Sequence, residues 1–278
     1  MEVKLASNYG FCFGVKRAIK IAEDYKDSAT MGPLIHNQDE INRLKNDFNV
    51  GLYNNLSDVK DHDTVIIRTH GIPKNDLKNL KALNAKVINA TCPFVTTPQQ
   101  IVKKMSKEGY SILIFGDADH PEVKGVQSYA ENQDDVHIVL EPSDLQNVIF
   151  RNNKIATVAQ TTKKKEKYLE IVNYLILKNK EVRVFNTICD ATFENQDAAR
   201  DLSKEVDIMI VIGGKNSSNT KQLHSICLEN CLNSYLIENE TELDNLWFLQ
   251  KKSCGVTAGA STPDWIIQQV VDKIESFN

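Results

Sequence analysis

Three of the six cysteines share one local setting, a turn directly before a segment with helical periodicity. They are Cys12 in NYGFCFGVKRAIK, Cys92 in INATCPFVTTPQQ and Cys189 in NTICDATFENQ. The N-terminus of a helix lowers the pKa of a thiol and favours the thiolate, which is the form that binds a metal. The pattern therefore predicts three thiolate ligands, and the alternative is three unrelated buried cysteines.

The other three cysteines, Cys227, Cys231 and Cys254, lack this setting. Cys227 and Cys231 stand four residues apart on one face of a predicted helix, and the sequence contains no C-x-x-C pair. That absence excludes zinc ribbons, thioredoxin-type redox sites and the sequential ferredoxin motif. Because cysteine is among the most buried residue types, we expect Cys227 and Cys231 to be core residues. None of the three is expected to bind metal.

Three of the six histidines, His36, His70 and His120, each follow a β-branched segment and precede a predicted helix. Each is expected to lie past the carboxyl end of a strand, where open α/β sheets bind ligands. Two turns of small residues, GGKNSSNT (213–220) and TAGAST (257–262), occupy similar positions. Their N–H groups and hydroxyls predict phosphate binding, and simple helix capping is the alternative for the turns. A structural role is the alternative for each histidine.

Glu122 stands two residues after His120 in DHPEVKG. Beside bound phosphates the pKa of its carboxyl would rise, which suits a proton donor. The alternative is a first-turn glutamate that stabilises a helix N-terminus. Arg68 is the one arginine that accompanies the histidine motifs. A small phosphorylated substrate held by hydrogen bonds therefore fits better than a polymer held by charge.

These residues need elements to position them, and β-branched runs alternate with helical segments along the chain. Strands are predicted at 64–68, 86–89, 110–115, 154–158, 207–212 and 234–237, and helices at 15–25, 38–46, 74–83, 98–108, 163–178, 191–204, 218–231 and 263–277. This alternation predicts an α/β fold with mainly parallel sheets.

The cysteines of the first set recur at intervals of roughly ninety residues, a length that suits one small α/β lobe each. We therefore predict three lobes, at 13–95, 96–188 and 189–278. The N-terminal strand within residues 1–12 is expected to join the third lobe.

Composition restricts the class of protein. The chain has 278 residues, 41% of them hydrophobic, with 33 basic and 37 acidic side chains and a net charge of −4. Such a composition excludes collagen-like and disordered chains and disfavours general nucleic-acid binding. No apolar run approaches the ~18 residues that span a bilayer. Glu2 stands where a secretory signal has basic charge. The sequence predicts a cytoplasmic protein with reduced thiols.

Taken in order, nine motifs resemble the 4-hydroxy-3-methylbut-2-enyl diphosphate reductase family, whose members catalyse the last step of the methylerythritol phosphate route to isoprenoids. The resemblance runs from residue 10 to about residue 265. The motifs are GFCFGVKRAI, GPLIHN, RTHGIP, ATCPFV, DHPEVKG, AQTT, ICDAT, GGKNSSNT and TAGASTPDW.

The resemblance implies three α/β lobes in pseudo-threefold arrangement around a 4Fe-4S cluster held by Cys12, Cys92 and Cys189. One iron then lacks a protein ligand and takes the hydroxyl of the substrate. Glu122 matches the proton source, Thr161 lies near the substrate hydroxyl, and Thr192 belongs to the same network. The residues that match the diphosphate-binding positions are His36, His70, His120, Ser217, Ser218, Asn219 and Ser261.

The implied reaction is reductive dehydroxylation of the family's substrate to isopentenyl and dimethylallyl diphosphate. Because no flavin or nicotinamide fingerprint occurs, the electrons are expected from a ferredoxin or flavodoxin type of donor. Two other functions stay open: a redox-neutral iron–sulfur dehydratase, and a non-catalytic metal-binding sensor of a phosphometabolite. The sequence departs from the family's pattern at Asn195, where a basic residue is more frequent, and at Asp117 and Asp119.

Overall fold

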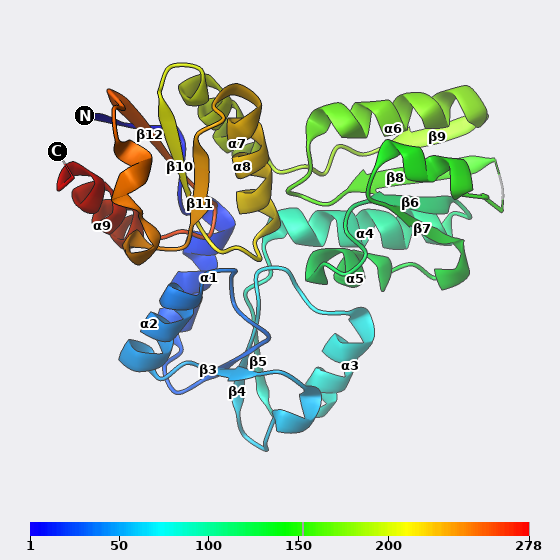
Figure 1. Cartoon of the computed structure of the whole chain (residues 1–278). Helices are drawn as coiled ribbons and strands as arrows, with labels where there is room; N and C mark the ends of the chain where they lie inside the picture. The colour runs from blue at the N-terminus through cyan, green and yellow to red at the C-terminus, as the bar shows by residue number, and fades with distance from the viewer. Residues whose placement is uncertain (152, 278) are drawn as a thin grey trace. The chain divides into compact units, whose positions relative to one another are not determined.

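The computed structural model of this protein describes residues 1–151 and 153–277. Within these residues the strands form three sheets of four strands each (Figure 1). Every strand pair is parallel. The predicted α/β class with three parallel-sheet lobes is therefore confirmed. The pseudo-threefold arrangement around a cluster stays a prediction.

The first sheet contains the N-terminal strand and has the order β1-β12-β10-β11. Its strands are β1 (Glu2–Leu5), β12 (Ser253–Ala258), β10 (Ile208–Ile212) and β11 (Ser234–Ile237). The helices of the same part of the chain are α7 (Asp190–Ser203), α8 (Ser218–Asn230) and α9 (Asp264–Glu275).

The other two sheets have the orders β3-β2-β4-β5 and β7-β6-β8-β9. Their strands are β2 (Ala29–Met31), β3 (Gly51–Tyr53), β4 (Thr64–Ile67), β5 (Lys86–Asn89), β6 (Ser111–Phe115), β7 (Val136–Val139), β8 (Lys154–Ala159) and β9 (Glu181–Val184). The remaining α-helices are α1 (Phe13–Asp24), α2 (Gln38–Phe48), α3 (Lys74–Ala82), α4 (Pro93–Lys107), α5 (Pro121–Gln127) and α6 (Lys165–Lys178).

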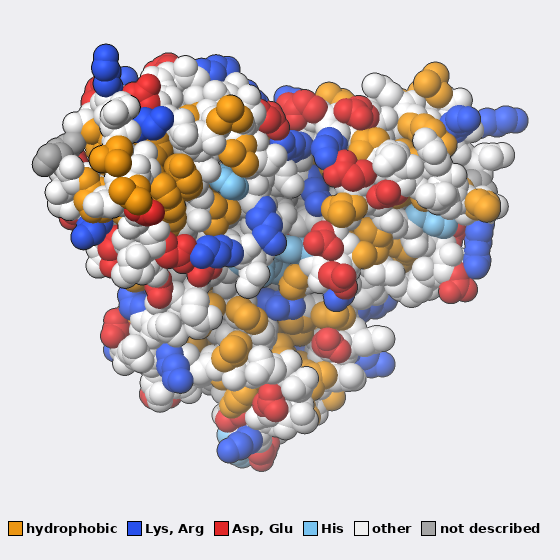
Figure 2. Space-filling view, in the orientation of Figure 1, with side chains coloured by type: hydrophobic (Ala, Val, Ile, Leu, Met, Phe, Trp, Pro, Cys, Tyr) orange, Lys and Arg blue, Asp and Glu red, His pale blue; other side chains and the backbone are white. Residues whose placement is uncertain are grey.

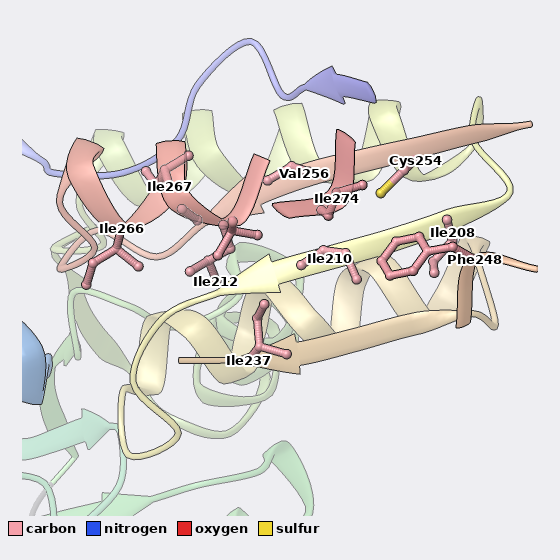
Figure 3. Packing of buried hydrophobic residues seen from close by; sticks show 12 residues of the cluster. Ile208, Ile210, Ile212, Ile237, Phe248, Cys254, Val256, Ile266, Ile267 and Ile274 are labelled. Carbon is pink, nitrogen blue, oxygen red and sulfur yellow. The ribbon is translucent and has the colours of Figure 1, made fainter. Parts of the chain in front are cut away.

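Strand β10 is buried on both faces, as the apolar run DIMIVI predicts. Its isoleucines at 208, 210 and 212 pack with α9, at Ile266, Ile267 and Ile274 (Figure 3). On the opposite face Met209 and Val211 pack with residues of α7 and α8. Each such buried side chain contributes about 1.5–3 kcal/mol to folding. This packing fixes the carboxyl end of β10, where the GGKNSSNT turn begins.

The chain forms two compact units. The first unit comprises Met1–Lys16, Ile35–Arg43 and Asp190–Asn278, and the second comprises Arg17–Leu34 and Leu44–Cys189. The first sheet lies in the first unit, and the other two sheets lie in the second. The three predicted lobe boundaries stay a prediction.

Helix α4 begins at Pro93, five residues before the predicted start at Pro98. Cys92 is its N-cap residue, and proline suits the first helical position because that N–H has no partner within a helix. Pro98 lies inside the helix with its ring buried, so it interrupts one backbone hydrogen bond without ending the helix. The earlier start places Cys92 directly at the helix N-terminus.

The surface agrees with the small net charge. On the face shown in Figure 2, Lys and Arg side chains are interspersed with Asp and Glu side chains. Across residues 1–151 and 153–277, every helix is too short or too polar to span a bilayer.

Candidate active site

The three cysteines predicted to bind metal all stand at helix N-termini, as the sequence predicts. Cys12 precedes α1, and its carbonyl accepts from the N–H of Lys16 at 2.9 Å. Cys92 caps α4, and Cys189 directly precedes α7. All three side chains are partly exposed. A partly exposed thiol at the positive end of a helix dipole suits a thiolate ligand.

Each of these cysteines is tied by its backbone N–H to a loop that carries a predicted substrate-binding residue. The N–H of Cys12 donates to Ala260, next to Ser261, at 3.2 Å, and the N–H of Cys92 donates to Thr69, next to His70, at 3.0 Å. The N–H of Cys189 donates to Thr161 itself at 3.0 Å. The three acceptor loops follow β12, β4 and β8, so the same local arrangement occurs once on each sheet.

The other three cysteines have a different environment. Cys227 and Cys231 belong to one core cluster of the first unit, and Cys254 belongs to another (Figure 3). Burial, with the nearby Cys231 thiol as a smaller cause, raises the pKa of Cys227 and of Cys254 to about 12. A thiol this hard to ionise suits a core residue and not a metal ligand. The expected burial of Cys227 and Cys231 is confirmed.

The first unit brings together His36 and the two small-residue turns. Ser261 donates from Oγ to the backbone carbonyl of His36 at 3.3 Å. A Cβ atom on Gly214 would lie 2.3 Å from that same carbonyl oxygen, so only glycine allows this approach. Ser217 is the N-cap of α8, and its side chain accepts from Thr220 N–H. The GGKNSSNT turn lies at the carboxyl end of β10, as the sequence predicts, and the TAGAST turn lies at the carboxyl end of β12, which was not among the predicted strands.

Within this group Asn219 gives the clearest indication of a bound ligand. It is 5% exposed. Among the described residues, neither its Nδ2 nor its Oδ1 has a hydrogen-bond partner. Burying an amide without partners costs about 1–3 kcal/mol. A ligand that hydrogen-bonds both atoms would recover that cost, and diphosphate oxygens can accept from Nδ2 at a helix N-terminus.

The second unit brings together His70, His120, Glu122 and Thr161. The rings of His70 and His120 meet edge to face, with centroids 5.3 Å apart. His120 is the N-cap of α5, where its Nδ1 accepts from Glu122 N–H at 3.2 Å. Thr161 donates twice to the Glu122 carboxylate, from N–H to Oε1 at 2.7 Å and from Oγ1 to Oε2 at 2.8 Å. Glu122 lies in α5, His120 lies directly before it, and Thr161 lies in the loop after β8.

Glu122 is 1% exposed, and burial raises the pKa of its carboxyl above the ordinary value of 4.5. The hydrogen bonds from Thr161 and the charge of Lys163 oppose that rise. Burial by itself therefore favours the protonated acid. The sequence analysis attributes a raised pKa of Glu122 to bound phosphate. In the structure the pKa is already raised without phosphate.

Two further buried polar residues, Gln196 of the first unit and Lys163 of the second, were not identified from the sequence. Gln196 is 3% exposed, and its Nε2 has no partner among the described residues. It stands four residues after the buried Thr192 on α7, a spacing that places both on one helix face. Lys163 is buried just before α6, which begins at Lys165, two residues after the predicted helix start. Gln196 could have been identified from its position four residues after Thr192. Lys163 could not, because the sequence does not distinguish it from the lysines that follow it.

The positions that depart from the family's pattern lie in two environments. Asn195 is buried on α7, whereas Asp117 and Asp119 are exposed in the loop after β6. The N–H of Asp117 donates to Gln160 Oε1 at 3.0 Å, which joins this loop to the loop after β8. These contacts hold the turn before His120 in place.

Comparison with known proteins gives one consistent result. A family model described as LytB protein matches residues 3–275. A protein of Sulfurovum sp. is 63% identical over 277 residues, and one of Nitratiruptor sp. is 62% identical over 277 residues. Each match covers at least 99% of both chains, and both proteins are named 4-hydroxy-3-methylbut-2-enyl diphosphate reductase.

Two solved structures agree. A structure of (E)-4-hydroxy-3-methyl-but-2-enyl diphosphate reductase, described as the terminal enzyme of the non-mevalonate pathway, is 43% identical. It matches with a TM-score of 0.71 over 99% of this chain and 100% of that chain. The structure of the E-1-hydroxy-2-methyl-but-2-enyl-4-diphosphate reductase from Plasmodium falciparum is 28% identical, with a TM-score of 0.91 over 98% of this chain and 87% of that chain. The chain belongs to the LytB protein family.

Proposed function

We propose that this chain catalyses the reductive dehydroxylation of 4-hydroxy-3-methylbut-2-enyl diphosphate to isopentenyl and dimethylallyl diphosphate. The full-length relatives named for that reductase support the assignment. The observation that carries it is the threefold recurrence of one arrangement. A partly exposed cysteine at a helix N-terminus is hydrogen-bonded to a loop with a predicted substrate residue, once on each sheet. Three unrelated buried cysteines do not account for that recurrence.

Cys12, Cys92 and Cys189 are proposed to hold an iron–sulfur cluster of the 4Fe-4S type. The donor set fits such a group, because these three thiols are partly exposed at helix N-termini while the other three are buried. When bound, the cluster supplies the electrons for C–O bond cleavage and one iron without a protein ligand. The electrons come from a ferredoxin or flavodoxin type of donor.

The diphosphate is proposed to be bound by hydrogen-bonding side chains and helix N-termini. In the first unit Asn219 carries most weight, because both of its amide atoms are buried without a protein partner. Ser217 and Ser218 lie at the start of the same helix, where N–H groups and the helix dipole favour anions. The full proposed set is His36, Ser217, Ser218, Asn219 and Ser261 of the first unit, with His70 and His120 of the second.

Glu122 is proposed to be the proton donor. Its buried carboxyl favours the protonated form, and its Oε2 lies 2.8 Å from Thr161 Oγ1. A hydroxyl both accepts and donates, so Thr161 can take the Glu122 proton and pass its own to the hydroxyl of the substrate. The hydroxyl of the substrate then leaves as water instead of hydroxide, which lowers the barrier to C–O cleavage. Thr192 is proposed to belong to the same network.

The experiment that tests this function is anaerobic purification followed by iron, sulfide and zinc analysis and an absorbance spectrum. We expect iron and sulfide in comparable amounts and the brown absorbance of an iron–sulfur protein. Zinc in place of iron would instead favour the sensor of a phosphometabolite. A redox-neutral dehydratase would have the same spectrum and would form product without consuming electrons.

A further inference from the structure

We propose that Glu40 is a positioning residue for the diphosphate site, with a buried carboxylate that holds the segment carrying His36 against the turn carrying Ser261. The inference rests on the proposed diphosphate-binding role of His36 and Ser261 and adds a residue to that site. Glu40 belongs neither to the proposed cluster ligands nor to the proposed diphosphate-binding set.

Residues 35–43 form a separate piece of the first unit, because the chain on either side of them belongs to the second unit. They contain His36 and most of the first two turns of α2, which begins at Gln38. Asn37 Oδ1 accepts from the N–H of Glu40 at 2.9 Å, as a helix-capping side chain does. His36 lies directly before this cap, so an interaction that fixes the first turn of α2 also fixes the backbone of His36.

This segment contacts the loops that follow three strands of the first sheet. Ser261, after β12, donates from Oγ to the His36 carbonyl, and a Cβ atom on Gly214, after β10, would clash with that carbonyl. Asn239, after β11, donates from Nδ2 to Asp39 Oδ2 at 3.0 Å. The segment is therefore attached at the carboxyl ends of β10, β11 and β12.

Glu40 attaches the same segment to α9. It is 1% exposed, and its carboxylate accepts three hydrogen bonds. Arg43 donates from Nη2 to Oε1 at 2.7 Å and from Nε to Oε2 at 3.0 Å. Trp265 on α9 donates from Nε1 to Oε2 at 3.0 Å. Hydrogen bonds to a charged group are roughly twice as strong as neutral ones, and a buried carboxylate requires them.

The contact between Glu40 and Trp265 is the second of two ties between the same stretches of chain. Glu40 stands four residues after His36, and Trp265 stands four residues after Ser261. A segment held by one hydrogen bond can pivot about it, whereas two spaced attachments fix its orientation. Glu40 thereby sets the position of His36 relative to Ser261. A diphosphate that uses both residues depends on that spacing.

Trp265→Phe is the milder test of this attachment. It removes the indole N–H and keeps an aromatic ring at a position that is 39% exposed, so we expect the variant to fold. Trp247→Phe is the matched control. Trp247 is the other tryptophan of the chain and lies in the same unit, where its ring stacks on that of Tyr235.

Glu40→Gln keeps the shape of the buried side chain and removes the charge that Arg43 and Trp265 bind. Asp197→Asn is its matched control, because Asp197 forms an ion pair of the same i,i+3 spacing with Arg200 on α7, and Asp197 is exposed. A purely structural Glu40 would lower the unfolding free energy when it is changed and would leave the affinity for the diphosphate substrate unaltered.

The measurement is calorimetric titration of the iron–sulfur-loaded protein with the diphosphate substrate, together with steady-state kinetics at saturating electron donor. We expect Trp265→Phe and Glu40→Gln to raise Kd and KM about threefold to tenfold and to leave kcat within about twofold of the wild type. That combination indicates lost binding that the ground state and the transition state share. Trp247→Phe and Asp197→Asn should bind the substrate as the wild type does.

The indole N–H signals in nitrogen-15 spectra test the hydrogen bond itself. Two tryptophans give two such signals, and the signal that Trp265→Phe loses is that of Trp265. In Glu40→Gln this signal should move upfield, because a neutral acceptor replaces the carboxylate. The Trp247 signal should stay in place. An unmoved Trp265 signal in Glu40→Gln would overturn the inference.

The affinities separate failure of this inference from failure of the proposed site. Wild-type affinity in Trp265→Phe and Glu40→Gln, with weakened binding in Asn219→Ala, would overturn the role of Glu40 and leave the diphosphate pocket standing. Wild-type affinity in all three variants would defeat the pocket and, with it, the inference.

Discussion

Thr161 accepts a hydrogen bond from the backbone N–H of Cys189 at 3.0 Å, and the same Thr161 donates twice to Glu122. A proposed cluster ligand and the proposed proton donor are thus joined through one residue of the loop after β8. Because the interaction with Cys189 uses the Thr161 carbonyl, it does not compete with the hydrogen bonds to Glu122. The side chain of Thr161 can therefore be changed while the tie to Cys189 is kept.

Thr161→Val tests that separation. Valine keeps the shape and both backbone hydrogen bonds and removes the Oγ1 donor, whose loss from a buried carboxylate costs about 1.5–3 kcal/mol. We expect normal iron content, a Glu122 pKa higher than in the wild type and single turnover slower by ~10-fold to 100-fold. Thr161→Ser keeps the hydroxyl and serves as the control. Equal single-turnover rates for the valine and serine variants would contradict the relay.

Cys92→Ser should lose normal cluster content, because serine at a proposed ligand position offers no thiolate. Cys227→Ser is the matched control, since Cys227 is buried in the core of the first unit. It should keep its iron and lose about 1–3 kcal/mol of unfolding free energy, from a hydroxyl buried among apolar groups. Iron and sulfide analysis with denaturant unfolding checks both. Full iron content in Cys92→Ser would remove that residue from the ligand set.

Asn219→Ala should weaken substrate binding by roughly tenfold to a hundredfold, the worth of one hydrogen bond to a charged group. It should keep the unfolding free energy of the wild type or raise it by up to about 1–3 kcal/mol, because the buried amide that it removes makes no hydrogen bond among the described residues. Asn230→Ala, at the end of the same helix, is the control for binding. Calorimetric titration with the diphosphate substrate measures both variants, and unchanged affinity in Asn219→Ala would count against the pocket.

Glu122→Gln should fold and bind substrate nearly as the wild type does, yet turn over ~10²–10⁴-fold more slowly. Stability gives a second signature. Since burial raises the pKa of Glu122 above 4.5, the protonated acid is favoured in the folded state. Its stabilising contribution is fully present below the unfolded pKa and is lost as pH rises through the folded pKa.

Glutamine cannot titrate, so the stability of the wild type relative to Glu122→Gln should fall as pH rises between these two pKa values. The slope in that window is ~1.4 kcal/mol per pH unit. Denaturant unfolding of both proteins across acidic and neutral pH measures it. If the stability difference between the two proteins stays constant with pH, the pKa of Glu122 is not raised in the folded state. If Glu122→Gln turns over within threefold of the wild-type rate, Glu122 is a structural residue and not the proton donor.

Much of this fold is predictable from local pattern. The runs at β4, β6, β8 and β10 are apolar on most residues, so they stand out as buried strands. Strand β9, by contrast, reads EVRV and lies at a sheet edge, where polar side chains face water. Strands β2 and β3 have three residues each, too few to show a period. Such strands are fixed by their neighbours and not by their own sequence.

Part of the candidate site was likewise predictable from local sequence pattern, and part was not. The settings of Cys12, Cys92 and Cys189 before helices were predictable, because a turn before a periodic segment is a local signal. The double hydrogen bond from Thr161 to Glu122 joins residues 39 positions apart and has no local signal. Lys163 lies over the Phe115 ring, which belongs to β6, 48 residues earlier in the chain. Tertiary contacts of this kind are what the sequence pattern does not contain.

In the proposed function the chain performs reduction at an iron–sulfur centre that Cys12, Cys92 and Cys189 are proposed to hold. The most direct measurement counts electrons taken from a reduced ferredoxin or flavodoxin type of donor against isopentenyl and dimethylallyl diphosphate formed, under anaerobic conditions. We predict one pair of electrons for each product molecule, and loss of both signals together in Cys92→Ser. Product formed without oxidation of the donor would contradict the claim and favour a redox-neutral dehydratase.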